Sequence, residues 1–154
     1  MQNYDEKIEE LGLKLPAAPS PMANYVTARR AGNLLFFSGA GPFVDGKPAV
    51  FGKVGAELTQ EQGYEAARLT GLNLIAQLKK ELGTLNSVKQ FLKVQAFVAS
   101  APDFMAQPAV MNGVSDLFVQ VFGEAGKHAR TAVAVPQLPF NISIEVEMIV
   151  EVTD

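Results

Sequence analysis

The sequence predicts one two-layer α+β domain, in which two helices cover one face of a sheet of about six strands. Segments with a two-residue hydrophobic repeat and segments with a helical repeat follow one another in the order ββ(β)–α–β–α–β–β. The length of 154 residues suits a single domain, and a hydrophobic content of 48% supplies its core. The first residues differ in composition, so we divide the chain into a helical extension with a linker, 1–20, and a main domain, 21–154.

The extension predicts one short helix and a connecting segment. Residues 3–12, NYDEKIEELG, are charged and end in a glycine, which is a typical helix stop. The residues at 16–21 are rich in Pro, Ala and Ser and predict a linker.

Two strands are predicted at the start of the main domain, at 25–28 and 34–37, joined across 31–33. An Asp-Gly turn signal at 45–46 precedes a short third strand near 48–51.

The first long helix, 59–82, is bounded by signals at both ends. Thr59 and Gln62 form a capping-box pattern, and Gly83 follows the last turn. A strand is predicted next, at 88–99, because apolar residues alternate there with Lys93 and Gln95. The apolar set is Leu92, Val94, Ala96 and Val98.

The second helix and the last two strands complete the domain. A proline suited to a first helical turn begins the helix at 108–122, and strands follow at 129–135 and 142–152. The last strand alternates clearly, with Ile142, Ile144, Val146, Met148 and Val150 facing one way and Ser143, Glu145, Glu147 and Glu151 the other.

Composition disfavours several classes of function. The net charge is −3 and the basic residues are scattered, which argues against a nucleic-acid partner. One histidine and no cysteine cannot build a typical zinc site, and no phosphate-binding glycine motif is present, so we expect neither metal nor organic cofactor. The lack of cysteine, of an apolar leader and of any membrane-spanning run leads us to expect a cytoplasmic protein without a membrane partner.

Several motifs occur in a fixed order along the chain. The segment 128–139, HARTAVAVPQLP, and the later 144–147, IEVE, place Arg130 and Glu145 fifteen residues apart. Upstream lie Tyr25 and the segment 32–39, GNLLFFSG, and Asn112 falls in the second predicted helix. These motifs resemble those of the Rid/YjgF family, the reactive-intermediate deaminases: 128–139 and 144–147 are similar to its C-terminal signature, and 32–39 to its glycine–asparagine motif. Tyr25 and Asn112 also match family positions, and the resemblance covers about 21–152.

The resemblance implies a chorismate mutase-like fold with a mixed sheet, assembled as a homotrimer with ligand clefts between subunits. It implies hydrolysis of a reactive enamine or imine to a keto compound and ammonia, without a cofactor. It also implies a strand between the last two predicted strands. A simple hairpin would instead place Arg130 opposite Glu145, but Pro136 and Pro139 argue against a tight turn there.

Arg130 and Glu145 are the expected centre of the site. A guanidinium is a planar fork that matches a carboxylate, so we expect Arg130 to bind a small carboxylate-bearing metabolite. The alternative is an exposed strand arginine, or one that pairs structurally with Glu145. Glu145 could simply be a solvent-exposed residue on the polar face of its strand. If it is functional instead, its role would be to hold and polarise a water molecule. Beside a guanidinium its carboxylate should stay ionised.

Five further residues complete the expected site. By resemblance, Tyr25 is a catalytic-site residue that closes the pocket, although it could equally be core packing. Ser38 and Gly39 would offer a hydroxyl and backbone amides to the substrate, or else be plain turn residues. Asn112 would shape the pocket or only bond its own helix. A main-chain carbonyl near Ala132 would help to order the water.

The chain departs from the family pattern at four positions, Ala40, Ser115, His128 and Ala132, so its substrate can differ from that of the best-known members. His128 is either a surface residue or shares the face of Arg130. Two other functions stay open. One is a non-catalytic trimer that binds or senses a metabolite; the other is an endoribonuclease or translation inhibitor, which the acidic balance and single histidine disfavour.

Overall fold

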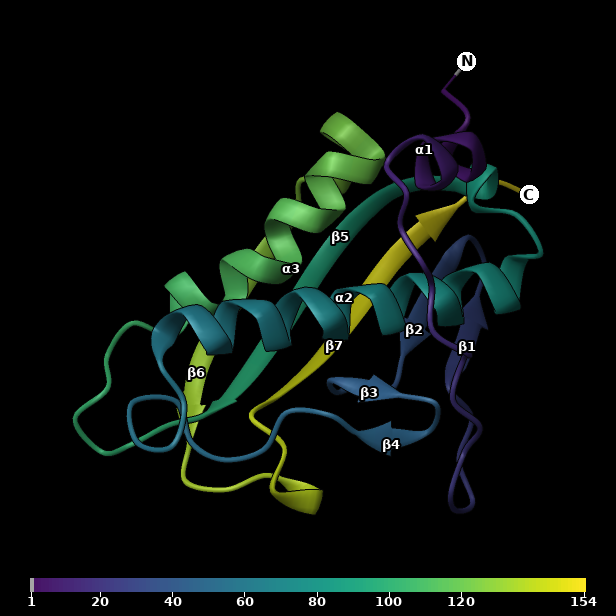
Figure 1. Cartoon of the computed structure of the whole chain (residues 1–154). Coiled ribbons are helices and arrows are strands. Elements are labelled where there is room, and N and C mark those ends of the chain that lie inside the picture. The colour runs from purple at the N-terminus through teal and green to yellow at the C-terminus, as the bar shows by residue number, and fades with distance from the viewer. Residues whose placement is uncertain (1) are drawn as a thin grey trace.

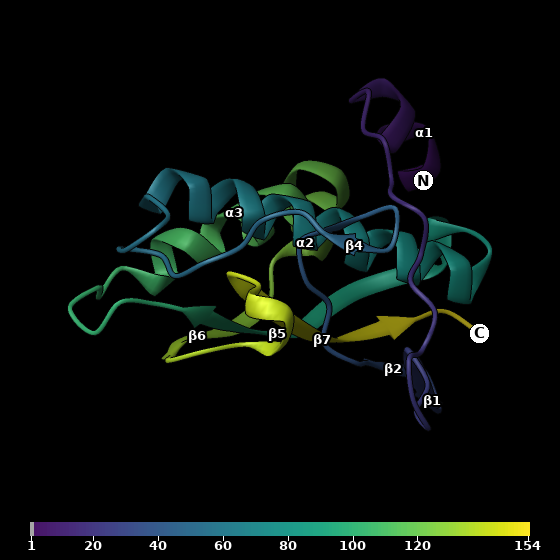
Figure 2. The same cartoon turned by 60° about the horizontal axis from the view of Figure 1, so that its bottom comes forward.

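The computed structural model describes residues 2–154. One layer is a five-stranded mixed sheet with the strand order β1-β2-β7-β5-β6. The long helices α2 and α3 pack against each other on one face of this sheet (Figures 1 and 2), as the sequence predicts. The strands of the sheet are β1 Ala28–Ala31, β2 Leu34–Phe37, β5 Val88–Ala99, β6 Ala129–Val135 and β7 Ile144–Val152, and the helices are α1 Tyr4–Glu10, α2 Gln60–Leu82 and α3 Gln107–Phe122.

The expected sheet of about six strands is a five-stranded sheet with a separate ribbon beside it. The ribbon pairs β3 Phe43–Val44 with β4 Lys47–Pro48 through the predicted turn. Asp45 and Gly46 have φ of 50° and 72°, the left-handed values that a tight two-residue hairpin turn requires.

The first strand begins three residues later than predicted. The backbone of Thr27 accepts a hydrogen bond from the Ser38 amide at 2.9 Å, and the carbonyl of Val26 accepts one from the Ser38 hydroxyl at 2.7 Å. Because these contacts replace a regular ladder, Tyr25 and Val26 are exposed outside the sheet.

The long strand β5 lies between β6 and β7, as the resemblance implied. It runs parallel to β6 and antiparallel to β7. The expected alternation is wrong at its start, because the register shifts between Phe91 and Lys93. This irregularity buries Phe91 and leaves Leu92 only partly buried.

The N-terminal helix α1 packs against the C-terminal ends of α2 and α3. The Tyr4 amide donates to the Asn86 side chain at 2.7 Å, and the Tyr4 ring lies 4.9 Å from the Phe122 ring. Asp5 forms an ion pair with Lys79 at 3.3 Å. These contacts connect α1 to both long helices and the turn before β5.

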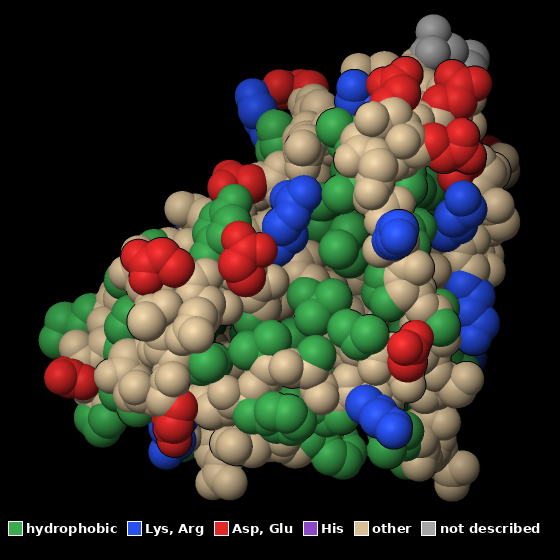
Figure 3. Space-filling view, viewed as in Figure 1, with side chains coloured by type: hydrophobic (Ala, Val, Ile, Leu, Met, Phe, Trp, Pro, Cys, Tyr) green, Lys and Arg blue, Asp and Glu red, His purple; other side chains and the backbone are tan. Residues whose placement is uncertain are grey.

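The surface over the helices is mixed in charge. Figure 3 shows basic and acidic side chains interspersed on this face, without a continuous basic stripe. Among the described residues, no helix has the length and apolar character needed to cross a membrane.

Candidate functional site

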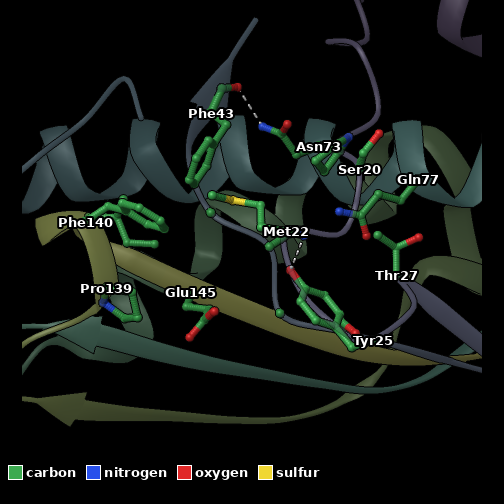
Figure 4. Close-up of a pocket in the computed structure, with 16 residues that line it drawn as sticks. Ser20, Met22, Tyr25, Thr27, Phe43, Asn73, Gln77, Pro139, Phe140 and Glu145 are labelled. Atoms are coloured by element: carbon green, nitrogen blue, oxygen red, sulfur yellow. Dashed lines mark hydrogen bonds between the residues drawn. The ribbon is translucent and has the colours of Figure 1, made fainter. Parts of the chain in front are cut away.

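The expected site residues fall into two groups within one chain. The first group, which we call the glutamate half-site, lines a cavity of about 130 Å³ between the end of β2, the start of β7 and α2 (Figure 4); it contains Tyr25, Ser38, Gly39 and Glu145. The second group, the arginine half-site, lies where β6 meets α3 and contains Asn112, Ser115, His128 and Arg130.

Glu145 lies half-buried at the start of β7, against the backbone of the segment that follows β2. A Cβ on residue 39 would lie only 2.7 Å from Glu145 Oε1, so the glycine allows this close approach. Its register partner is Phe97, and the next residue, Val146, faces the buried core. Glu145 therefore points to the sheet face opposite the helices.

In the single chain, the surroundings of Glu145 shift its titration toward the neutral form, which is opposite to the effect expected from a neighbouring guanidinium. Burial raises the pKa of the Glu145 carboxyl, and the nearby Glu147 raises it further. Among residues 2–154, no Lys or Arg forms an ion pair with Glu145. The carboxyl therefore lacks the guanidinium neighbour that would hold it ionised.

Tyr25 and Ser38 form the outer part of the glutamate half-site. Half of the Tyr25 surface is exposed, 50%, and its Oη accepts a hydrogen bond from the Met22 amide at 3.5 Å. The Ser38 hydroxyl already donates to a backbone carbonyl, so its oxygen can still accept a hydrogen bond from a ligand.

Arg130 is exposed on the edge strand β6, and its orientation is fixed by the neighbouring helix. Its Nη1 donates to Asn112 Oδ1 at 2.8 Å and to Ser115 Oγ at 3.2 Å. Arg130 pairs in register with the buried Val94, which places it on the helix-covered side of the sheet. The alternative in which Arg130 pairs with Glu145 is thus wrong within one chain, because the two side chains leave opposite faces.

His128 and Ser115 belong to the arginine half-site, a role that sequence reasoning left undecided for His128 and did not assign to Ser115. His128 Nδ1 lies 2.7 Å from the Gly126 carbonyl, and Nε2 lies 3.0 Å from Ser115 Oγ. Since a carbonyl oxygen can only accept a hydrogen bond, Nδ1 carries the proton. Nε2 therefore accepts a hydrogen bond from the Ser115 hydroxyl. Ser115 lies one helical turn after Asn112, and His128 lies two residues before Arg130, so each pair is spaced to share one face. This spacing in the sequence could have identified both residues as neighbours of the site.

The pKa of His128 is lowered, which keeps the imidazole neutral. Burial is the main cause, and the positive charge of Arg130 adds to it, while the hydrogen bond to Gly126 acts in the opposite direction. The result is a chain of hydrogen bonds from Arg130 through Ser115 to a neutral His128. Ala132 follows on β6, partly buried against the core.

Comparison with known proteins agrees with this architecture. Residues 5–152 match the family described as "YjgF/chorismate mutase-like, putative endoribonuclease". The chain is 44% identical to Protein TCP17 of Trypanosoma cruzi, over 96% of this chain and 92% of that protein. It is 33% identical to a RutC family protein of Pyrococcus horikoshii, over 86% of this chain and 90% of that protein.

A solved structure extends the agreement to three dimensions. A Shewanella oneidensis protein described as a "putative endoribonuclease" superposes with a TM-score of 0.94 at 33% identity, covering 98% of this chain and 100% of that one. The family match spans nearly the whole chain and agrees with the motifs around Arg130 and Glu145. The chain therefore belongs to the Rid/YjgF family.

Proposed function

We propose that this protein hydrolyses 2-imino acids, or the enamines in equilibrium with them, to 2-keto acids and ammonia. The reaction takes place in clefts between the subunits of a homotrimer. Each cleft combines the arginine half-site of one protomer with the glutamate half-site of its neighbour. Arg130 binds the substrate carboxylate, and Glu145 acts on the water.

One observation carries this proposal: each half-site holds a charge that the other could complement. The Arg130 guanidinium is oriented by two hydrogen bonds, yet no described residue forms an ion pair with it. Glu145 is half-buried with no cationic partner in its own chain. An anionic substrate between them would be bound by the first group and meet a base in the second.

The homotrimer is supported by the surface of the sheet. The face opposite the helices exposes Phe36 and Val133. In addition, β6 is an edge strand, so Arg130 lies at a boundary that another protomer can approach. Large apolar side chains exposed on an uncovered sheet face are typical of a surface that packs against a partner.

The chemistry needs only the protonated imine, water and a carboxylate that exchanges one proton. Glu145 removes a proton from water while the water oxygen bonds to the imine carbon and the C=N electron pair moves to nitrogen. Glu145 then gives that proton to the amino group of the carbinolamine. The C–N bond breaks as the hydroxyl oxygen forms the carbonyl, ammonia leaves, and the hydroxyl proton passes to solvent.

The raised pKa of Glu145 suits both halves of this exchange, because a carboxyl that holds its proton more tightly than usual is a stronger base when ionised and can then return that proton as the acid. A positioned group of this kind contributes about 10²–10⁴-fold to a rate. The lack of cysteine leads us to place this activity in the cytoplasm.

The direct test supplies freshly generated 2-imino acids, made by an amino-acid oxidase, and follows ammonia release. We expect faster release with the protein than without it, and no acceleration by a Glu145→Gln variant. Binding of 2-keto acids without accelerated release would instead identify a metabolite-binding protein. Glu151→Gln is the control, since Glu151 lies on the same face of β7 near its other end and does not line the cavity.

A further inference from the structure

The cavity of the glutamate half-site extends from Glu145 to two amide side chains on α2. Asn73 and Gln77 lie one helical turn apart and both line it. Figure 4 shows Met22 and Phe43 between these amides and Glu145. The cavity thus has a carboxylate at one side, an apolar middle and an uncharged polar end.

The Asn73 amide has a fixed orientation. Asn73 is 2% exposed, and its Nδ2 donates to the carbonyls of Phe43 and Leu69 at 2.9 and 3.0 Å. Those bonds use both amide hydrogens, so the oxygen and nitrogen cannot be exchanged. Asn73 Oδ1 accepts no hydrogen bond from a described side chain or backbone group and can accept one from a ligand.

Gln77 is the unexplained residue of the cavity. It is 5% exposed, and its amide makes no hydrogen bond with any of residues 2–154; its Oε1 is buried without a partner. An unpaired buried amide destabilises a fold, so an apolar residue would serve packing better. Buried polar groups of this kind need a separate explanation, and a ligand group that pairs with the amide supplies one.

We infer that Asn73 and Gln77 form a subsite for a neutral polar group, a hydroxyl or a carboxamide, at the end of an apolar substrate side chain. The inference rests on the proposed function, which places the substrate carboxylate on Arg130 and its reacting carbon at Glu145. The remaining part of the substrate then extends into this cavity. A group that both donates and accepts can pair with Asn73 Oδ1 and the Gln77 amide together.

The charge and size of the cavity define the substrate class. Glu145 is the one charged side chain among the residues that line it, so a charged end group would be buried without a counter-ion. A cavity of about 150 Å³ can hold benzene, so the cavity here, about 130 Å³, suits a side chain of about five or six non-hydrogen atoms.

The test measures binding of two stable 2-keto acids with the same unbranched carbon chain, one ending in a methyl group and one in a hydroxyl. We expect the wild-type protein to bind the hydroxyl acid roughly tenfold more tightly, the usual effect of one buried hydrogen bond. Gln77→Leu should lose this preference while binding the methyl acid at least as well. Gln77→Met provides a second, unbranched variant if the first folds poorly.

Thr70→Val is the matched control. Thr70 is a fully buried polar residue of the same helix that donates to the Ala66 carbonyl at 2.8 Å and does not line the cavity. This variant should keep the preference for the hydroxyl acid. Equal wild-type affinities for the two acids, or a preference that survives both Gln77 variants, would overturn the subsite and leave imine hydrolysis standing. Failure to bind either acid, together with no acceleration of imine hydrolysis, would remove both.

Discussion

Two side chains of α3 fix the orientation of the Arg130 guanidinium within the single chain. Asn112 and Ser115 take both hydrogens of Nη1, which leaves Nε and Nη2 as a pair of donors for a carboxylate. We expect Arg130→Ala to weaken binding of a 2-keto acid by about 2–5 kcal/mol, because the proposed cleft buries the pair of Arg130 and the substrate carboxylate and this is the usual cost of removing one partner of such a pair. Titration calorimetry measures this change.

Arg68→Ala is the matched control for that experiment. Arg68 likewise donates from one guanidinium nitrogen to a side-chain amide, Gln120 Oε1 at 3.1 Å, but it lies on the outer surface of the helices. Its removal should leave the affinity unchanged. Equal losses in both variants would show that Arg130 acts through general surface charge rather than as a binding group.

His128 reports on the same half-site, because it is the sole histidine and gives a single imidazole titration. Burial and Arg130 both disfavour its charged form, so NMR should give a His128 pKa below its ordinary value of 6.5. Removing the positive charge with Arg130→Ala should raise this pKa, since protonation no longer meets a repelling cation. A titration curve that does not respond to Arg130→Ala would contradict the electrostatic effect of Arg130 on His128.

At the scale of elements, α2 depends on the cap at its first turn. The Thr59 side chain accepts from the Gln62 amide at 3.1 Å, and the Gln62 side chain accepts from the Thr59 amide at 2.9 Å. Thr59→Ala should lower the free energy of unfolding by about 1 kcal/mol, and Thr59→Ser should restore most of it. Urea unfolding measures both, and imine hydrolysis should change little because the cap does not line the cavity.

The elements that the sequence predicts well are those with local signals. Helix α2 has its capping box and terminal glycine, and β7 alternates along its whole length, so both match the structure closely. Contacts between distant segments determine where β1 begins and which side of the sheet Phe91 faces. The first depends on the hydrogen bonds of Ser38 and the second on the irregular pairing of β5 with β7. Such contacts leave no pattern in the surrounding residues.

The candidate site shows the same limit. Motifs identify Arg130, Glu145 and Asn112 but not Ser115 or His128. The division of the site into two half-sites depends on strand order and on which face of the sheet each side chain leaves. The alternation of polar and apolar residues along one strand does not determine which strand pairs with it or in which register. The position of β5 between Arg130 and Glu145 came from the resemblance rather than from spacing.

The separation of the half-sites has a consequence for the whole molecule. If the protein forms the proposed homotrimer and each cleft takes Arg130 from one protomer and Glu145 from the next, Arg130→Ala and Glu145→Gln trimers are inactive for different reasons. A mixed trimer can then hold a cleft in which both groups are intact, because each variant supplies the residue that the other lacks. A cleft built within one chain could never be restored in this way.

Dissociating and reassembling the two inactive variants together therefore tests the arrangement directly. In a one-to-one mixture, head-to-tail contacts between protomers should restore about a quarter of the clefts. Imine hydrolysis should recover to about that fraction of the wild-type rate, and only after subunit exchange, since mixing intact trimers brings no intact pair together. A reassembled mixture that stays inactive, while reassembled wild-type protein regains full activity, would contradict the shared cleft.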